Sequence, residues 1–284
     1  MTDPFHLLHT PLGEPGSGRV RYGAAMALHA RGLLSEATLE VYRICSPLDA
    51  EDPLPMLAER GLAPPPPVPP IGTTALAQLR DEAARYLAGL PGEGAAEVRL
   101  GLMRARPADD PPAAAPHPVV ETFLGEALAL VERTHPALAL AIAAAAPYLP
   151  WTTYNRYPPA MIGESFARLH AFASLAGERA AFREGNYDFG VFLIAPHVLY
   201  RDHRHLAPEL YAPLTGPHGW RFAPGAPLVV KPAHEPVWND ANQPHLTKVG
   251  PNPFLCFFGW TADVNAPAEV IPAPDWAELE ALRL

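Results

Sequence analysis

Two histidines and a carboxylate at H-x-H-x3-E spacing constrain this chain more than any other feature. They are His203, His205 and Glu209; Tyr211 stands two residues after the glutamate. Gly216 follows the glutamate after an interval of six residues, where a hairpin needs a turn. Because successive side chains of a β-strand point to opposite faces, His203 and His205 share one face, and Glu209 and Tyr211 can share it too. The spacing predicts a site for one divalent cation in a β-barrel.

Apolar residues recur at helical intervals in the earlier part of the chain. Three stretches have this period, and a fourth follows a pair of prolines: 24–42, 74–90, 119–134 and 162–175. Apolar positions at three- and four-residue steps place one stripe of a helix against a core. Two proline-rich stretches cannot be regular, so we expect a stiff connector over 64–70 and a loop over 106–118.

After residue 185 the pattern changes to short alternating runs that are interrupted by glycine and proline. We expect strands at 187–194, 210–214, 219–222, 228–230, 246–249 and 254–260. Several short strands at close spacing predict a jelly-roll barrel. The sequence therefore predicts an α+β fold, with a helical N-terminal region over residues 1–150 and a C-terminal β-barrel domain over residues 151–284.

The charge of the chain limits the partners it can have. A net charge of −9 argues against a nucleic-acid backbone or an anionic membrane and is compatible with a small zwitterionic or cationic molecule. We expect no secretory signal, because no basic segment followed by an apolar run is evident at the start, and the longest apolar stretch, 137–146, is too short to cross a bilayer. We therefore expect a soluble, cytoplasmic protein. Cys45 and Cys256 lie far apart and form no disulfide framework.

The H-x-H-x3-E-x6-G spacing resembles the first signature motif of the cupin superfamily, although His197 occupies the place of the usual glycine before the first histidine. The second cupin motif contributes one more histidine after a turn, and His234 and His245 are the two candidates. His245 is favoured, because it follows Asn242, which tolerates the left-handed backbone of a turn, and because it opens an apolar run. The resemblance implies that the barrel is a cupin double-stranded β-helix.

The resemblance extends to the cupin-type dimethylsulfoniopropionate (DMSP) lyases over residues 185–265. It is carried by Tyr200, His203, His205, Glu209, Tyr211, Gly216, Trp220, Gln243-Pro244-His245, Asn252-Pro253-Phe254-Leu255 and Trp260. It implies a divalent metal held by four side chains: His203, His205, Glu209 and His245. It also implies that Tyr211 lies at the metal as a candidate base and that Tyr200 lines the substrate pocket.

The residue types suit this chemistry on their own. Imidazole and carboxylate ligands bind Zn, Fe, Mn, Co or Ni without discriminating well among them, and a six-coordinate ion keeps open positions for a substrate carboxylate. A phenolate beside the cation can then remove the α-proton, and a β leaving group departs. Tyr200, Trp220 and Trp260 offer aromatic faces to a cationic sulfonium group. Ordinary barrel packing is the alternative for the two tryptophans.

The sequence thus predicts a metal-dependent carbon–sulfur lyase that cleaves DMSP or a close analogue to acrylate and dimethyl sulfide. Two alternatives stay open: a cupin dioxygenase or isomerase acting on another small carboxylate, and a non-catalytic metal- or ligand-binding cupin. The N-terminal helices would bury their apolar stripes either as a lid over the barrel mouth or in a homodimer interface.

Overall fold

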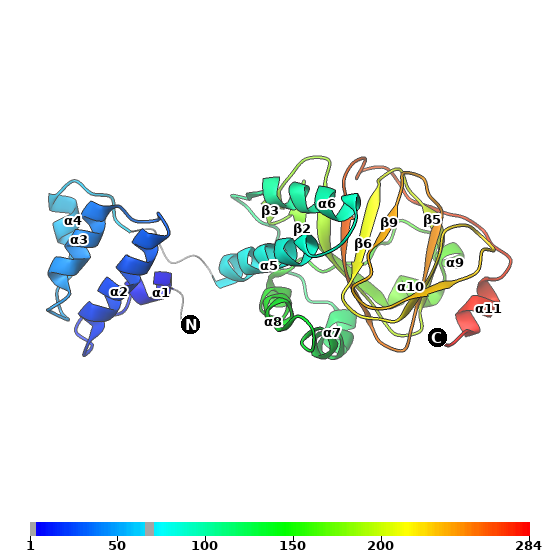
Figure 1. The fold of residues 1–284 in the computed structure, drawn as a ribbon, viewed down its shortest axis with the longest axis horizontal. Coiled ribbons are helices and arrows are strands. Elements are labelled where there is room, and N and C mark those ends of the chain that lie inside the picture. The colour runs from blue at the N-terminus through cyan, green and yellow to red at the C-terminus, as the bar shows by residue number, and fades with distance from the viewer. Residues whose placement is uncertain (1–3, 66–70) are drawn as a thin grey trace. The chain divides into compact units, whose positions relative to one another are not determined.

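The structure, a computed structural model, describes residues 4–65 and 71–284 (Figure 1). They belong to two compact units, Met1–Ile71 and Gly72–Leu284. The boundary expected near residue 150 lies inside the second unit, where it marks the change from helices to strands. Most of the proline-rich connector, residues 66–70, lies outside the described residues.

In the first unit, four helices enclose a small apolar core within residues 4–65. They are α1 (Pro4–Leu8), α2 (Ser17–Ala30), α3 (Glu36–Cys45) and α4 (Pro53–Glu59). The single helix expected over 24–42 is wrong. Gly32, at φ 72°, lies just beyond α2 in the left-handed conformation that ends many helices. Ser35 then caps α3, because its hydroxyl accepts a hydrogen bond from the Thr38 N–H.

The second unit combines helices with a β-barrel. Its helices are α5 (Ile71–Ala88), α6 (Glu93–Arg104), α7 (Pro118–Val131), α8 (Pro136–Ala145), the 3₁₀ turn η1 (Ala146–Tyr148), α9 (Pro159–Ile162), α10 (Glu164–Arg168) and α11 (Trp276–Ala281). Its strands are β1 (Arg106–Pro107), β2 (His170–Gly177), β3 (Phe182–Arg183), β4 (Asp188–Ile194), β5 (Leu199–Arg204), β6 (Glu209–Pro213), β7 (His218–Arg221), β8 (Val229–Lys231), β9 (Val237–Asn239), β10 (His245–Val249), β11 (Phe254–Trp260) and β12 (Glu269–Val270).

The strands form two sheets. The order is β1-β3-β2-β4-β11-β6-β9 in the seven-stranded sheet and β12-β5-β10-β7-β8 in the five-stranded sheet. Between the sheets lies a core of aromatic side chains, and Phe192, Tyr211, Trp220, Phe254 and Phe258 belong to it. This arrangement of paired sheets confirms the predicted α+β fold with a barrel in the C-terminal part.

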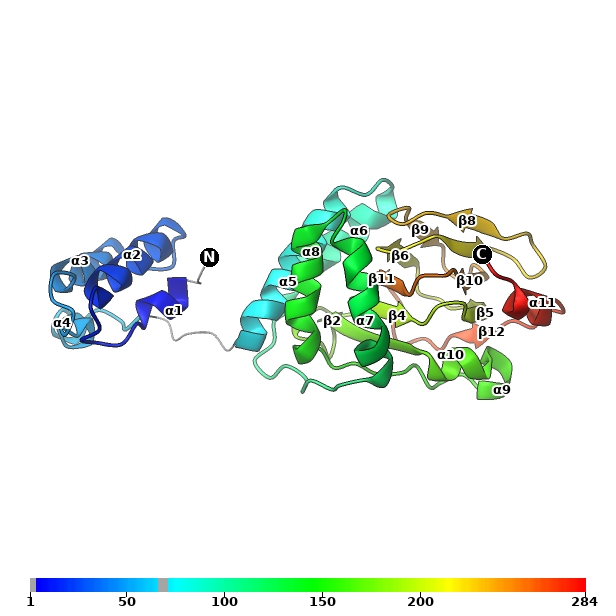
Figure 2. The same cartoon turned by 90° about the horizontal axis from the view of Figure 1, so that it is seen from below.

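The larger sheet is apolar on both faces. In β11, Phe254, Cys256 and Phe258 face the barrel core, whereas Leu255 and Phe257 face a second core that the helices cover. Both faces are buried, so this strand reads as a continuous apolar run instead of an alternating one. Helices α5 to α8 lie along the outer face of this sheet (Figure 2).

Helices and strands were predicted unequally well from the sequence. The helices expected over 74–90 and 119–134 are confirmed as α5 and α7, and the strand expected over 254–260 is confirmed as β11. The helix expected over 162–175 is wrong, because α10 ends at Arg168 and β2 begins at His170. Burial on both sides removes the alternation that would have marked β2 as a strand. Within the described ranges, no helix is both long and apolar enough to span a membrane.

Glycine allows α6 to approach the sheet closely. A Cβ atom added at Gly101 would lie 2.2 Å from the ring of Tyr187. That ring cannot swing aside freely, since its hydroxyl donates a buried hydrogen bond to the Val98 carbonyl at 2.7 Å. A Cβ atom added at Gly125, which is exposed in the middle of α7, would have no neighbouring atom within 4 Å.

We therefore expect Gly101→Ala to destabilise the second unit by about 1–3 kcal/mol through overpacking. Gly125→Ala is the matched control and should be neutral or stabilise by about 0.5–1 kcal/mol, because alanine favours the helix. Urea unfolding followed by tryptophan fluorescence measures both, since the first unit contains no tryptophan. Equal midpoints for the two variants would contradict the close approach.

Candidate metal centre

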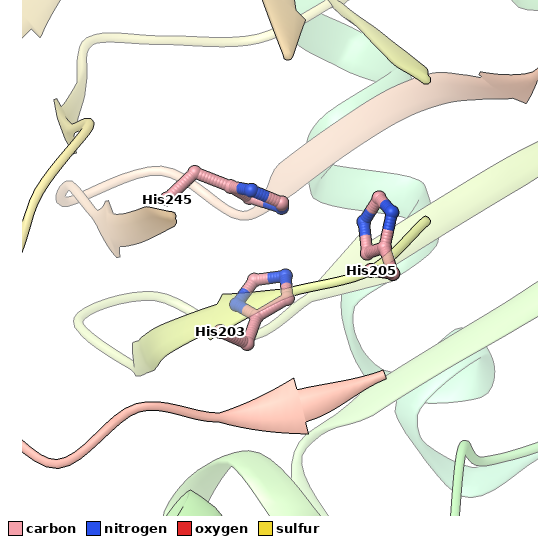
Figure 3. A group of neighbouring side chains, drawn as sticks. All are labelled: His203, His205 and His245. Carbon is pink, nitrogen blue, oxygen red and sulfur yellow. The ribbon is translucent and has the colours of Figure 1, made fainter. Parts of the chain in front are cut away.

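Strand pairing brings two of the histidines together. His203 lies in β5 and is the register partner of His245, which opens β10. Directly opposed residues of an antiparallel pair project from the same face, so both imidazoles enter the barrel. His205 follows the end of β5, and Glu209 opens β6. Figure 3 shows the three imidazoles turned toward one another.

The opposite face of β5 is fixed by a buried ion pair. Asp202, whose side chain alternates with that of His203, accepts two hydrogen bonds from Arg221 of β7, at 2.8 and 2.5 Å. Arg221 also pairs with Asp275, and Trp276 at the start of α11 donates to Asp202 at 2.7 Å. Asp202 and Arg221 are almost fully buried. This network locks the strand that carries His203.

Each of the three imidazoles is oriented by a backbone carbonyl two residues away. The Nδ1 atoms of His203, His205 and His245 lie 2.8, 2.8 and 2.9 Å from the carbonyl oxygens of Arg201, Ala207 and Gln243. A carbonyl oxygen can only accept, so Nδ1 carries the proton in each ring. In each neutral ring the lone pair therefore lies on Nε2, the atom that can bind a metal.

Glu209 supplies an oxygen to the same place. Its Oε2 lies 3.1 Å from His205 Nε2 and 3.3 Å from His245 Nε2, and its Oε1 accepts a hydrogen bond from Trp260 at 2.7 Å. Burial by itself would raise the pKa of the Glu209 carboxyl, but the neighbouring His205 and His245 lower it below its usual value. Burial lowers the pKa of the His205 ring, but the facing Glu209 carboxylate raises it above its usual value, so a proton holds this pair together where a divalent cation would replace it.

The residues fit a divalent metal. His203, His205 and His245 each offer one atom, and these atoms lie within 4.8 Å of one another. The Nε2 atoms of His203 and His245 are buried and have no hydrogen-bond partner among the described residues. Burial lowers the pKa of His203 well below its usual value, which keeps the ring neutral and able to bind a metal. Three imidazoles and one carboxylate suit the transition metals that the sequence predicts.

A column of stacked rings supports His203 from the side. His203 stacks on Tyr200 at a centroid distance of 3.9 Å, Tyr200 on Phe166 at 3.9 Å, and Phe166 on His170 at 4.0 Å. The buried His170 accepts a hydrogen bond from the Tyr154 N–H, and burial lowers its pKa to about 4, so it stays neutral. The Tyr200 hydroxyl is paired with that of Tyr157 at 3.0 Å.

A cavity of about 580 Å³ opens beside the metal centre. Tyr200, Glu209, Tyr211 and Trp260 line it near the centre, and Asp188 lines it farther away. The Tyr211 ring lies 6.1 Å from the His245 ring, centroid to centroid. Burial raises the pKa of the Tyr211 phenol well above its usual value, and Glu209 raises it further. Without a cation beside it, this phenol stays protonated.

Two residues considered in the sequence lie elsewhere. Trp220 is fully buried among Tyr211 and Phe254 and is not part of the cavity wall, so ordinary barrel packing describes it. The ring of His234 forms hydrogen bonds with the hydroxyl groups of Tyr86 and Thr134, at 3.1 and 3.0 Å, and lies outside the barrel core. The histidine that joins His203 and His205 is His245.

Sequence reasoning missed the residues that support the site. Tyr157, Phe166 and His170 reach it from segments before the barrel strands that carry the ligands, and no spacing relates them to the histidine motif. For Asp188, the sequence carries a weak indication that its side chain faces the barrel interior. It is the polar first residue of an apolar run and is in phase with Gly190 and Phe192, which face the barrel interior.

Fold and centre together define a cupin: two facing, mainly antiparallel sheets with a histidine and carboxylate site inside the barrel. A sequence model of the dimethylsulfoniopropionate lyase family matches residues 96–256, more than half of the chain. The chain therefore belongs to the dimethylsulfoniopropionate lyase family, which places it among the carbon–sulfur lyases. No curated protein matches the chain significantly.

Solved structures resemble this one. One described as belonging to the DMSP lyases RdDddP and RnDddQII is 23% identical and has a TM-score of 0.56, over 71% of this chain and 100% of that one. The DMSP lyase DddQ from Ruegeria pomeroyi DSS-3 is 22% identical, with a TM-score of 0.44 over 57% of this chain and 81% of that one. The first likeness supports the fold.

The metal content of variants can show whether His245 or His234 is the third histidine ligand. We expect His245→Ala to lower the amount of bound transition metal about tenfold or more. Loss of a residue that only hydrogen-bonds to a metal ligand already lowers metal affinity by about that factor, and loss of a ligand should cost at least as much. His234→Ala should keep the metal content of the wild type. Elemental analysis of both purified variants provides the measurement. Full occupancy in His245→Ala would remove this residue from the ligand set.

Proposed function

We propose that His203, His205, Glu209 and His245 hold one divalent transition metal and that the protein uses this centre to cleave DMSP into acrylate and dimethyl sulfide. The observation that carries the proposal is the convergence of three imidazole nitrogens and one carboxylate oxygen beside a cavity lined by Tyr211. A bound metal would hold the substrate carboxylate, acidify the neighbouring C–H bond and lower the pKa of the Tyr211 phenol.

Tyr211 is the proposed base, because it lines the cavity two residues after Glu209 in the same strand. Its phenolate oxygen removes the proton from the α-carbon. The C–H electron pair then forms the double bond of acrylate, and the bond between the β-carbon and sulfur breaks. Sulfur keeps the pair of that bond and leaves as neutral dimethyl sulfide, so no acid is needed on the leaving group.

Aromatic residues around the cavity exclude water and face the sulfonium group. Trp260 is held in place by its hydrogen bond to Glu209, and Tyr200 by its pairing with Tyr157 and its stacking on His203. Aromatic faces stabilise a nearby cation by about 0.5–2 kcal/mol each. Tyr200 thus both orients His203, a proposed metal ligand, and shapes the substrate pocket.

The metal, the location and the oligomeric state are predictions. The metal can be Zn, Fe, Mn, Co or Ni, since the ligand set suits each of them. A cytoplasmic location follows from the sequence interpretation alone. A homodimer would bury the exposed apolar side chains of the helices, such as Leu100 and Leu140.

Loss of the base should abolish most of the activity. We expect Tyr211→Phe to reduce dimethyl sulfide release from DMSP by about 10²- to 10⁴-fold while the metal stays bound. Tyr86→Phe is the control: it removes a buried phenol that contacts His234 on the outer side of the sheet. Headspace measurement of dimethyl sulfide with metal-loaded protein gives the rates. A Tyr211→Phe variant as fast as the wild type would exclude Tyr211 as the base.

If the wild type released no sulfide but iron-loaded protein consumed oxygen, the dioxygenase alternative would replace the lyase.

A further inference from the structure

Asp188 places a second carboxylate on the wall of the same cavity. It opens β4 and is the register partner of Trp260 in β11, which in turn is the partner of Glu209 in β6. Directly opposed residues on neighbouring strands project from the same face of a sheet. Asp188 and Glu209 therefore both face the barrel interior, with Trp260 between them in the cross-strand row, and all three line the cavity.

The Asp188 carboxylate has no cationic partner within the part of the chain that the structure describes. Its Oδ1 is buried and accepts no hydrogen bond from those residues. Burial raises the pKa of Asp188 to about 7, and only the Ser174 side chain opposes this shift. The residue is half-buried in the cavity wall, and its one buried oxygen without a hydrogen bond leaves a place for a cationic ligand group.

The spacing of the two residues across the sheet suits a small zwitterion. Neighbouring strands lie about 4.8 Å apart, so two steps across the sheet separate the backbones of Asp188 and Glu209 by about 10 Å. Metal–ligand bonds of about 2 Å would place the substrate carboxylate next to Glu209. Three single bonds of about 1.5 Å each then carry the onium group past Trp260 toward Asp188.

We propose that Asp188 is the counter-charge that recognises the cationic end of the substrate, so the cavity selects carboxylates with a sulfonium or quaternary ammonium group on the β-carbon. The placement of the substrate carboxylate rests on the proposed function. Asp188 binds the cation in the ground state. Since the leaving group departs neutral, the attraction weakens as the carbon–sulfur bond breaks, and the residue contributes to binding more than to the chemical step.

Two ligands of the same shape test the proposal apart from the release of dimethyl sulfide. β-Trimethylammonio-propanoate carries the cation, and β-tert-butyl-propanoate is its neutral isostere. Calorimetric titration of the metal-loaded full chain should show that the cationic ligand binds about tenfold more tightly, as a close charge pair predicts. Asp188→Asn should lose this preference and bind the neutral ligand as the wild type does.

Glu178→Gln is the matched control. Glu178 borders the same cavity but is exposed, and it is held by Asn265 at 3.2 Å, so solvent screens its charge. This variant should keep the preference for the cationic ligand. Thermal unfolding provides the control on folding: Asp188→Asn should leave Tm unchanged or raise it, because it removes an unpaired buried charge.

Kinetics with DMSP supply a second readout. We expect Asp188→Asn to raise KM about tenfold and to leave kcat unchanged or higher, whereas loss of a catalytic group would lower kcat. A protein that prefers the cationic ligand through Asp188 but releases no sulfide keeps this inference and loses the proposed function. If Asp188→Asn retained the ligand preference and the wild-type KM, recognition of the cation by Asp188 would be wrong, whatever the activity.

Discussion

The metal centre depends on three hydrogen bonds that imidazole rings donate to backbone carbonyl groups. His203, His205 and His245 each donate from Nδ1 to a carbonyl two residues away, and this fixes which nitrogen carries the proton. Because backbone geometry orients all three rings, their Nε2 atoms converge before any metal binds. The ion would therefore meet a site that is already organised, and little ordering would oppose its binding.

The large sheet connects this centre to the rest of the second unit. Its outer face packs on α5 to α8, and its inner face carries Glu209, Tyr211 and Trp260. A strand that is buried on both faces has little freedom to slip, since a shift of one residue would exchange its two faces. The helical cover thereby keeps the residues of the cavity wall in register, and the Asp202–Arg221 pair does the same for the strand of His203.

Charge is distributed along the cavity in a way that suits a zwitterion. Glu209 is shared with the histidines at one end, Asp188 has no cationic partner among the described residues at the other, and Trp260 stands between them in the cross-strand row. Family membership gives the chemical class of the reaction. The arrangement of these three side chains, which comes from one cross-strand row, supplies a physical reason why a substrate with separated charges would fit.

The sequence by itself determined the ligand motif, the barrel class and most of the long helices, because these depend on local spacing: H-x-H-x3-E on a strand, short runs between turns, and the stripes of α5 and α7. Asn242 before His245 gave a correct local signal as well, since it adopts φ 61° in the turn. Only the tertiary structure decided that His234 and Trp220 lie outside the site and that His170, Phe166 and Asp188 belong to its surroundings. Those placements depend on strand register and on contacts between segments far apart in the chain, and no periodicity along one segment encodes which distant strand it will face.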